Sequence, residues 1–399
     1  FYQVRDAKYP HLVDLMKNAG YFTGIRGKIP HSTPYTPYAW DVELETLPDG
    51  SKVHPKNAKS YGHSTAEGIR LAKAAGKPFC LLMNISDPHK PFYAEGKNGE
   101  TVPDANVPSR VFTPDEVPVP GFLFDDPVVR KELSHYYSSV RRADDCAAEI
   151  LAALRGAGLE KDTLVLFSSE QGSQFPGCKW TNWDTGLHTA LVARWPGRVA
   201  AGRRTDALVQ YADVAPTLVE LAGGDPADAA FRFDGTSFAA VLRGAKDAHR
   251  AFAHGAHNNI PEGPAYPVRS VTDGEWRYIR NLAPGEIYIE KHLMGLLGGG
   301  APHNPYWPTW VATAWDNPDT YRLVKRYMVR PAEQLYHTAA DPHEMADLAG
   351  DPAHAAVKAR LSAELDRWLA AQGDPGIPQD THEAHRAAAK GRHLYTPPN

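Results

Sequence analysis

The sequence predicts an α/β domain with a mostly parallel sheet sandwiched by helices over residues 1–244, and a smaller α+β unit over residues 245–399 built on an antiparallel sheet. The first observation is a set of short apolar runs at Tyr21–Ile25, Phe79–Ile85 and Thr163–Phe167. Runs of this length are typical of parallel strands that are covered on both faces. The second observation is that helical patterns separate these runs, as in a parallel sheet with helices on both faces.

The helices and remaining strands of the first part follow from spacing and stop signals. Pro10–Ala19 has apolar residues at helical intervals before a glycine, and Thr65–Ala75 precedes the second strand. A long amphipathic helix is expected over about 128–154. The last expected elements are strands at Thr189–Arg194 and Ala207–Gln210 and a helix with Pro216 in its first turn.

The chain changes character after about Gly244. Val268–Val271 and Trp276–Asn281 flank a Thr-Asp-Gly-Glu sequence, which predicts an antiparallel hairpin. Glu333–Tyr336 adds a short strand, and Pro352–Ala371 has the apolar spacing of a terminal helix. This part therefore forms the separate α+β unit.

Composition limits the classes of function. With 399 residues and 42% hydrophobic content the chain exceeds the size at which a single core stops growing. A net charge of -4 gives no electrostatic argument for nucleic acid or for an anionic membrane, so an anionic substrate must meet local positive charge. No apolar run reaches transmembrane length. The three cysteines form no CxxC pair, and we expect buried free thiols.

The segment Asp162–Trp183 places polar side chains directly after a buried strand. Glu170 and Gln171 follow the carboxyl end of that strand, where open α/β sheets place their ligands. Their oxygens suit a hard cation such as Ca²⁺ or Mg²⁺, although an exposed turn without a ligand is the alternative. Lys179 lies a few residues further on and would meet an anion held by that cation.

Three motifs occur in one order along the chain: AGYFTGIRGKIPH at Ala19–His31, NISDPHKPF at Asn84–Phe92 and SSEQGSQFPGCKW at Ser168–Trp180. Two later segments follow them, YPVRSVTDGEWRYIRNL and RPAEQLYHTAADPHEMADLAGDP. Together they resemble the formylglycine-dependent (type I) sulfatases of the alkaline-phosphatase-like superfamily, in the branch that is similar to heparan N-sulfatase (sulfamidase). The resemblance covers nearly the whole chain and implies the alkaline-phosphatase-like fold.

The resemblance implies roles for four catalytic residues. By analogy Lys28 binds the sulfate, and His31 orients the nucleophile. His89 would be a sulfate ligand and the general acid that protonates the leaving group, a role suited to a side chain that titrates near neutral pH. Lys179 resembles the basic residue that contacts the sulfate oxygens.

The resemblance also implies a metal site and substrate contacts. Glu170 and Gln171 occupy the positions of calcium ligands, with Mg²⁺ as the other possible ion. The usual pair in the family is Asp followed by Asn or His, so Glu-Gln is a departure. His257 and Arg269 lie in the segment that approaches the substrate pocket in this branch, and we expect sugar or carboxylate contacts there.

The family's nucleophile motif has no match in this sequence. Sulfatases carry, upstream of the matching region, a strand with paired aspartates for calcium and a C-x-P-x-R motif whose cysteine becomes formylglycine. None of Cys80, Cys146 and Cys178 is followed by x-P-x-R. We expect the strand, the nucleophile and about half of the metal shell in a segment outside these 399 residues, whether a separate fragment or an omitted part. A chain without that central strand should expose apolar strand edges.

The expected activity is hydrolysis of a sulfate ester or sulfamate on a sugar, with N-sulfoglucosamine of heparin or heparan type as the nearest substrate. Two alternatives stay open: a phosphomonoesterase or phosphodiesterase of the same superfamily, and a non-catalytic protein, such as a truncated pseudoenzyme, that binds sulfated glycans. The partner is a sulfated saccharide, not nucleic acid, and the chain could also form a homo-oligomer. A periplasmic or secreted location is favoured.

Overall fold

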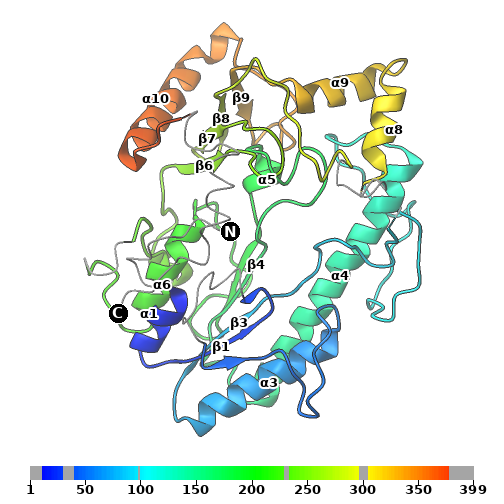
Figure 1. Ribbon diagram of the computed structural model, residues 1–399. Coiled ribbons are helices and arrows are strands. Elements are labelled where there is room, and N and C mark those ends of the chain that lie inside the picture. The colour runs from blue at the N-terminus through cyan, green and yellow to red at the C-terminus, as the bar shows by residue number, and fades with distance from the viewer. Residues whose placement is uncertain (1–10, 30–39, 98, 229–232, 296–303, 377–399) are drawn as a thin grey trace, which may run out of the picture.

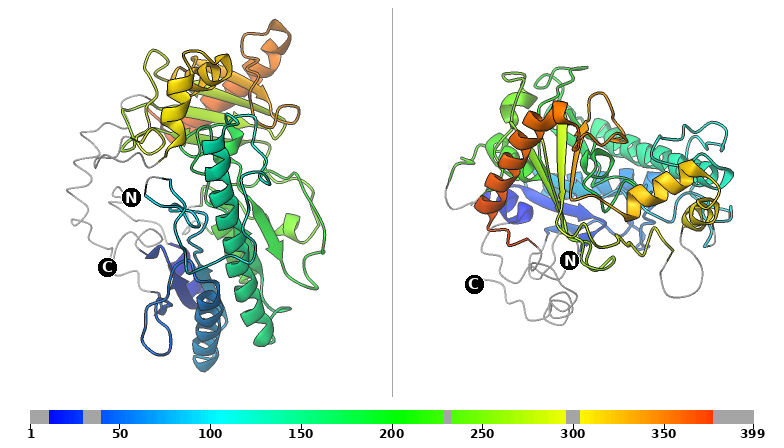
Figure 2. Two further views of the ribbon diagram at one scale, coloured as in Figure 1. Left: turned by 90° about the vertical axis from the view of Figure 1, so that its right-hand side faces the viewer. Right: turned by 90° about the horizontal axis from the view of Figure 1, so that it is seen from above.

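The structure, a computed structural model, describes residues 11–29, 40–97, 99–228, 233–295 and 304–376. In Figure 1 a small sheet of parallel strands lies in one half of the molecule and an antiparallel sheet lies in the other. The long helix α4 (Pro127–Gly156) runs from the first half to the second, as the side view in Figure 2 shows.

The parallel sheet has the strand order β2 (Val42–Glu43), β1 (Phe22–Arg26), β3 (Phe79–Met83). Phe22 pairs with Phe79 and Arg26 with Met83, so β1 and β3 end at the same edge of the sheet. Residues that follow the two strands are therefore brought close together, as expected for parallel strands.

Helix α3 (Ala58–Ala74) covers this sheet and packs along α4. It begins seven residues before the predicted start at Thr65, because the Asn57 side chain accepts a hydrogen bond from the Ser60 amide at 3.0 Å. That contact satisfies one of the free amides of the first turn.

Strands β4 (Val165–Ser168) and β5 (Leu191–Arg194) pair with each other, and they are antiparallel, not parallel as the alternation predicted. The segment between them folds back at one end of the sheet. The Ser169 amide donates to the Ala190 carbonyl at 3.3 Å and the Gly172 amide to the Gly186 carbonyl at 3.1 Å. The segment is thus a long hairpin, without the crossover helix that a parallel pair needs.

A cavity of about 2980 Å³ separates the two sheets of this half. In the described part of the chain β3 pairs only with β1 and β2 does not reach it, while β4 pairs only with β5. The side chains of β3 and β4, together with apolar residues of α4 and of α6 (Val214–Leu221), line the cavity. Phe167 is 40% exposed and Val192 is 58% exposed. These two residues pair across β4 and β5, so apolar side chains are exposed on one face of this two-stranded sheet.

The second half is a four-stranded antiparallel sheet of β6 (Ala253–His257), β7 (Val268–Thr272), β8 (Trp276–Asn281) and β9 (Glu333–His337). The predicted hairpin is confirmed as β7 and β8. Helix α10 (Ala355–Gln372) packs on β7 and β8. The side chains buried between them are Val271, Tyr278, Leu335, Leu361 and Leu365.

Several elements differ from the prediction or were not predicted. Ala207–Gln210 is not a strand, because only Leu208 forms a bridge, to Arg250. Strand β6 has a small and polar sequence, AHGAH, that gives no strand pattern. The shorter helices complete the description: α1 (Leu12–Asn18), α5 (Asp184–Leu187), η1 (Tyr211–Asp213), α7 (Ala239–Leu242), α8 (Tyr306–Thr313), α9 (Pro318–Met328) and η2 (Pro352–His354).

The two halves share an aromatic core. Phe175 stacks on Tyr306 with ring centroids 5.5 Å apart, and Trp183 packs against Tyr327. Asp184 forms an ion pair with Arg277 at 2.5 Å. Since residues near 175–184 pack into the second half, the domain boundary near residue 244 stays a prediction.

Two smaller expectations concern cysteines and membranes. Cys146 and Cys178 are buried and Cys80 is half-buried, and all three are free thiols. Burial raises the pKa of Cys178 to about 11, so this thiol stays protonated and unreactive at neutral pH. None of the helices in the described ranges combines the length and apolar composition that a membrane crossing requires.

Candidate anion-binding site

Three positively charged or titratable side chains from different parts of the sequence line the same cavity. Lys28 follows β1, His89 follows β3, and Lys179 lies in the segment after β4. Partial burial lowers the pKa of His89, and the charges of Lys28 and Lys179 lower it further. The structure therefore brings these three predicted residues close enough for their charges to interact, in a place suited to an anion.

Lys28 projects from a tight turn. Gly27 and Lys28 both have left-handed backbone, with φ of 71° and 53°. A Cβ at Gly27 would lie 2.9 Å from the Asn84 carbonyl oxygen, so only glycine fits. The Asn84 side chain donates to the Gly27 carbonyl at 2.8 Å and fixes this turn to the end of β3. A lysine in a left-handed conformation costs about 1 kcal/mol, a strain that is often found at functional sites.

His89 is held by its neighbours in one orientation. Its Nδ1 lies 2.7 Å from the Lys90 carbonyl oxygen, and because a carbonyl only accepts, Nδ1 carries the proton. Nε2 is then the nitrogen left to meet a ligand. Lys56 Nζ donates to the His89 carbonyl at 3.0 Å and forms an ion pair with Asp87, also at 3.0 Å. Asp87 is in turn bound by Arg142 at 2.5 Å, so the loop is anchored on α4.

Lys179 lies between anions and an aromatic ring. Burial lowers its pKa, and Lys28 lowers it as well, while Glu170 and Glu262 raise it. Its Nζ lies 4.7 Å from the centroid of the Trp180 ring. Trp180 has a left-handed backbone with φ of 66°, an uncommon conformation for a bulky residue.

Glu170 and Gln171 are exposed just past β4, and both line the cavity. Gly172 follows them because a Cβ there would lie 2.1 Å from the Thr185 carbonyl oxygen. Their side-chain oxygens are hard donors and fit part of a Ca²⁺ or Mg²⁺ shell, since Ca²⁺ takes about six to eight oxygen ligands. Two residues alone do not complete such a shell.

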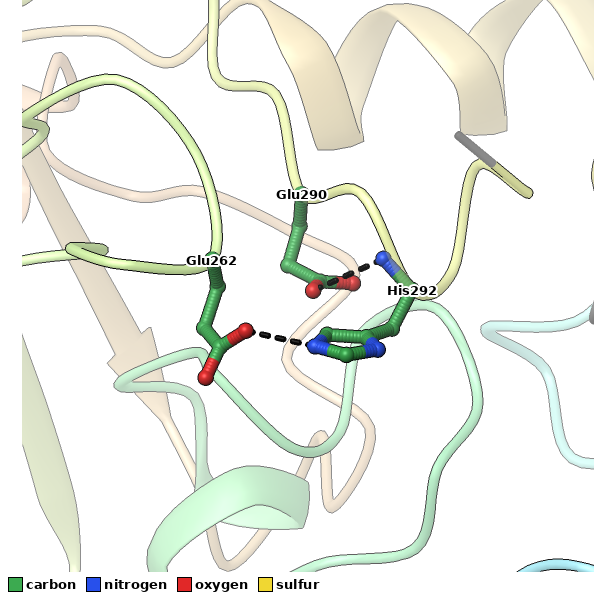
Figure 3. Close-up of side chains that lie close together, drawn as sticks. All are labelled: Glu262, Glu290 and His292. Carbon is green, nitrogen blue, oxygen red and sulfur yellow. Dashed lines mark hydrogen bonds and ion pairs between the residues drawn. The ribbon is translucent and has the colours of Figure 1, made fainter. Parts of the chain in front are cut away.

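A further cluster was not predicted from the sequence. Figure 3 shows Glu262, Glu290 and His292, with His292 Nε2 2.5 Å from the Glu262 carboxylate. The buried Glu290 carboxylate accepts the amides of His292 and Leu293 at 3.0 and 2.7 Å. The His292 ring stacks on Trp180, with centroids 5.3 Å apart and an interplanar angle of 7°. These residues lie in irregular loops, where no periodic pattern marks them.

The other predicted residues lie elsewhere. His257 and Arg269 do not line the cavity. Arg269 is 1% exposed and forms an ion pair with Asp374 at 2.5 Å and a hydrogen bond to Asn258 at 2.7 Å, which ties β7 to the end of α10. Burial lowers the pKa of His257 to about 4. His31 lies outside the described residues.

Strand ends that gather cations and oxygen donors around one cavity suit an enzyme that binds an anionic substrate. The sulfatase family profile matches residues 2–224, more than half of the sequence, and the chain belongs to this family. A second profile, the C-terminal region of N-sulphoglucosamine sulphohydrolase, matches residues 179–283. Sulfatases hydrolyse sulfate esters, which is the class of enzyme that this chain represents.

Curated relatives support the same family. An ulvan-active sulfatase of Formosa agariphila is 29% identical over 381 residues, which cover 93% of this chain and 68% of the relative. Human N-sulphoglucosamine sulphohydrolase is 27% identical over 391 residues, covering 91% of this chain and 74% of the human protein. The expected branch, with its specific C-terminal region, is thus confirmed.

Solved structures confirm the fold. A protein solved in complex with its substrate, D-glucosamine-2-N,6-O-disulfate, has a TM-score of 0.58 and 16% identity, and the match covers 92% of this chain and 83% of that protein. The phosphonate monoester hydrolase of Agrobacterium radiobacter has a TM-score of 0.59 and 19% identity, and covers 92% and 81%. Both identities are low, so these likenesses concern the fold.

Proposed function

We propose that the chain forms the anion-binding part of a sulfatase that acts on a sulfated glucosamine of heparin or heparan type. The observation that carries the proposal is the convergence of Lys28, His89 and Lys179 on one cavity. The likeness of residues 179–283 to the C-terminal region of N-sulphoglucosamine sulphohydrolase supports this choice of substrate. A sulfamate or a sulfate ester on glucosamine would serve equally well at the anion site.

In this proposal the two lysines bind the sulfate. Lys28 and Lys179 contact its oxygens and offset the charge that develops there as the bond to sulfur breaks. The partial burial of Lys179 strengthens that interaction, because fewer waters screen it. Neither lysine gains or loses a proton in the reaction.

His89 acts as the general acid. In the absence of an anion, burial and the charges of Lys28 and Lys179 together keep the pKa of its imidazole low. A bound sulfate neutralises those charges and raises the pKa, so the ring takes up a second proton, on Nε2, when substrate is present. The Nε2 proton then passes to the leaving oxygen or nitrogen of the sugar. Nδ1 keeps its proton on the Lys90 carbonyl throughout.

Glu170 and Gln171 would hold part of a Ca²⁺ or Mg²⁺ ion, which supplies Lewis-acid stabilisation of the sulfate charge. We assign the remaining ligands and the formylglycine nucleophile to a segment outside these 399 residues. The cavity between β3 and β4 supports this assignment. Each strand offers an edge without a strand partner among the described residues, and the apolar lining suits an extended strand.

The test is sulfate release from glucosamine N-sulfate by the active enzyme, with Lys28→Ala and His89→Ala variants. Each change should lower kcat/KM by about 10²–10⁴-fold, the usual effect of losing a charge-stabilising or proton-transfer group. Lys246→Ala, at an exposed lysine far along the chain, is the matched control. Full activity in either of the first two variants would refute the role given to that residue.

The same assay separates the alternatives. Hydrolysis of a phosphate ester in preference to a sulfate ester would favour the phosphatase hypothesis. The residue at the nucleophile position would then be Thr or Ser. Tight binding of the sulfated sugar without turnover, even with Ca²⁺ present, would favour the hypothesis of a non-catalytic glycan-binding protein.

A further inference from the structure

Glu262 and His292 form an ion pair at the edge of the anion site. His292 Nε2 lies 2.5 Å from Glu262 Oε2, and the Lys291 ammonium lies 3.7 Å from the same oxygen. Both Glu262 and His292 line the cavity that Lys28, His89 and Lys179 share. The pair keeps Glu262 ionised, because the His292 hydrogen bond lowers the pKa of that carboxyl.

The pair connects to the anion site through one aromatic ring. His292 stacks on Trp180, and Lys179 Nζ lies over the Trp180 ring at 4.7 Å from its centroid. The contacts form a chain: the Lys179 ammonium contacts the Trp180 indole, the indole stacks on the His292 imidazole, and the imidazole holds the Glu262 carboxylate. An anion is favoured at the Lys179 end, and a hydrogen-bond donor is favoured at the Glu262 end.

Two loop segments hold this pair rigidly; we call residues 259–263 and 288–292 together the clasp. The Asn259 side chain donates to the Ile289 carbonyl at 2.8 Å, and the Lys291 amide donates to the Glu262 carbonyl at 2.9 Å. A Cβ at Gly263 would lie 1.8 Å from the Ile289 carbonyl oxygen, so the segments meet only with glycine there. A carboxylate fixed before the ligand arrives loses little entropy on binding.

A metal ion fits this cluster poorly, although three ligand atoms from Glu262, Glu290 and His292 lie within 4.8 Å of one another. The Glu290 carboxylate is already engaged by two backbone amides, as Figure 3 shows for the His292 amide. The charge of the Lys179 ammonium lowers the pKa of Glu262, so Lys179 is near enough to repel a metal ion bound there. A neutral donor is the better ligand.

We propose that the clasp is a saccharide-binding subsite in which Glu262, oriented by His292, accepts a hydrogen bond from a hydroxyl group of the sugar that carries the sulfate. This inference rests on the proposed function for the position of the sulfate. It makes Glu262 a specificity residue: the carboxylate favours a sugar with a hydroxyl at that position and disfavours one with a second sulfate there.

The decisive experiment compares two ligands in calorimetry and two substrates in kinetics. Glu262→Ala should weaken the binding of glucosamine N-sulfate by about tenfold to a hundredfold, the effect of losing a hydrogen bond to a charged group. The binding of inorganic sulfate should change by a factor at least ten times smaller. In turnover, kcat/KM should fall at least ten times more with glucosamine N-sulfate than with para-nitrophenyl sulfate, which has no sugar hydroxyls.

Two variants keep the test sharp. Glu286→Ala, at an exposed glutamate between the two clasp segments, is the control and should change neither ligand's affinity. Glu262→Gln keeps the shape and one acceptor oxygen, so its effect should be smaller than that of Glu262→Ala. Equal losses for the sugar and for inorganic sulfate would assign Glu262 to folding and overturn the subsite. Unchanged affinity for the sugar would overturn it as well.

The outcomes also separate this inference from the proposed function. An enzyme that binds glucosamine N-sulfate through Glu262 but turns over no sulfate ester retains the subsite and refutes the catalytic proposal. If the enzyme hydrolyses para-nitrophenyl sulfate and Glu262→Ala leaves its affinity for glucosamine N-sulfate unchanged, the subsite alone is refuted.

Discussion

The strand ends of the parallel sheet and the clasp of the second half are built in opposite ways. At the strand ends backbone turns place the positively charged Lys28 and the titratable His89, and among the described residues neither side chain has a carboxylate in direct contact. In the clasp each charged group already has a partner, as Glu262 does in His292. The difference teaches that the first region is prepared for an external anion, whereas the second is prepared for a neutral ligand.

The largest expected effect tests whether Arg269 stabilises the second half of the molecule and takes no part in substrate binding. Arg269→Met should destabilise the protein by about 3–5 kcal/mol, because it leaves Asp374 without the arginine of a buried ion pair. Urea unfolding measures the loss. The KM for glucosamine N-sulfate of the folded variant should be unchanged, since Arg269 does not line the cavity. A raised KM with unchanged stability would show instead that Arg269 contacts the substrate.

The next effect tests the strand ends. Lys179→Ala should lower kcat/KM for any sulfate ester by about 10²–10³-fold, because the sulfate loses a partly buried positive charge. Lys179→Arg keeps that charge and should retain most of the activity. Kinetics with para-nitrophenyl sulfate checks both variants. If Lys179→Ala affected only sugar substrates, Lys179 would belong with the clasp and the contrast between the two regions would fail.

A smaller effect concerns acid stability. The pKa of His257 is lowered from 6.5 to about 4 by burial, so the unfolded chain binds a proton more readily than the folded one. The free energy of unfolding should therefore fall as pH decreases from about 6.5 to about 4, by up to about 3 kcal/mol, and should level off below. Thermal unfolding across this range measures it. His257→Leu should flatten the dependence, and an unchanged slope would rule out His257 as its source.

The smallest effect tests the anchoring of His89. Lys56→Met removes a charge that lowers the pKa of His89 and a donor that holds its carbonyl. We expect about a tenfold loss of kcat, a magnitude typical of a displaced catalytic group. The limb of the pH–kcat/KM profile that reports His89 should also shift to higher pH. Lys56→Arg keeps the charge and should leave the limb in place. A loss of activity with no shift would assign Lys56 a packing role only.

The sequence allowed prediction of what local pattern controls. Lys28 and His89 follow neighbouring parallel strands, whose ends meet at one edge of the sheet. The place of Lys179 beside them followed from the resemblance to sulfatases, because β4 belongs to a separate sheet. Glu262 and His292 could not be, because their contact arises from two irregular loops joined by Asn259 and Gly263. The antiparallel pairing of β4 and β5 also escaped prediction, since apolar runs carry no sign of strand direction.

Trp180 has a consequence for substrate choice. Its indole contacts both the Lys179 ammonium and the His292 ring, and its carbonyl accepts a hydrogen bond from the buried Tyr288 hydroxyl at 2.7 Å. Because both groups contact this one side chain, its size limits how far apart charge recognition and sugar recognition can lie. In relatives that keep the lysines but carry a different side chain at this position, the distance between charge recognition and sugar recognition would differ. Such relatives would select sugars with the sulfate on a different carbon.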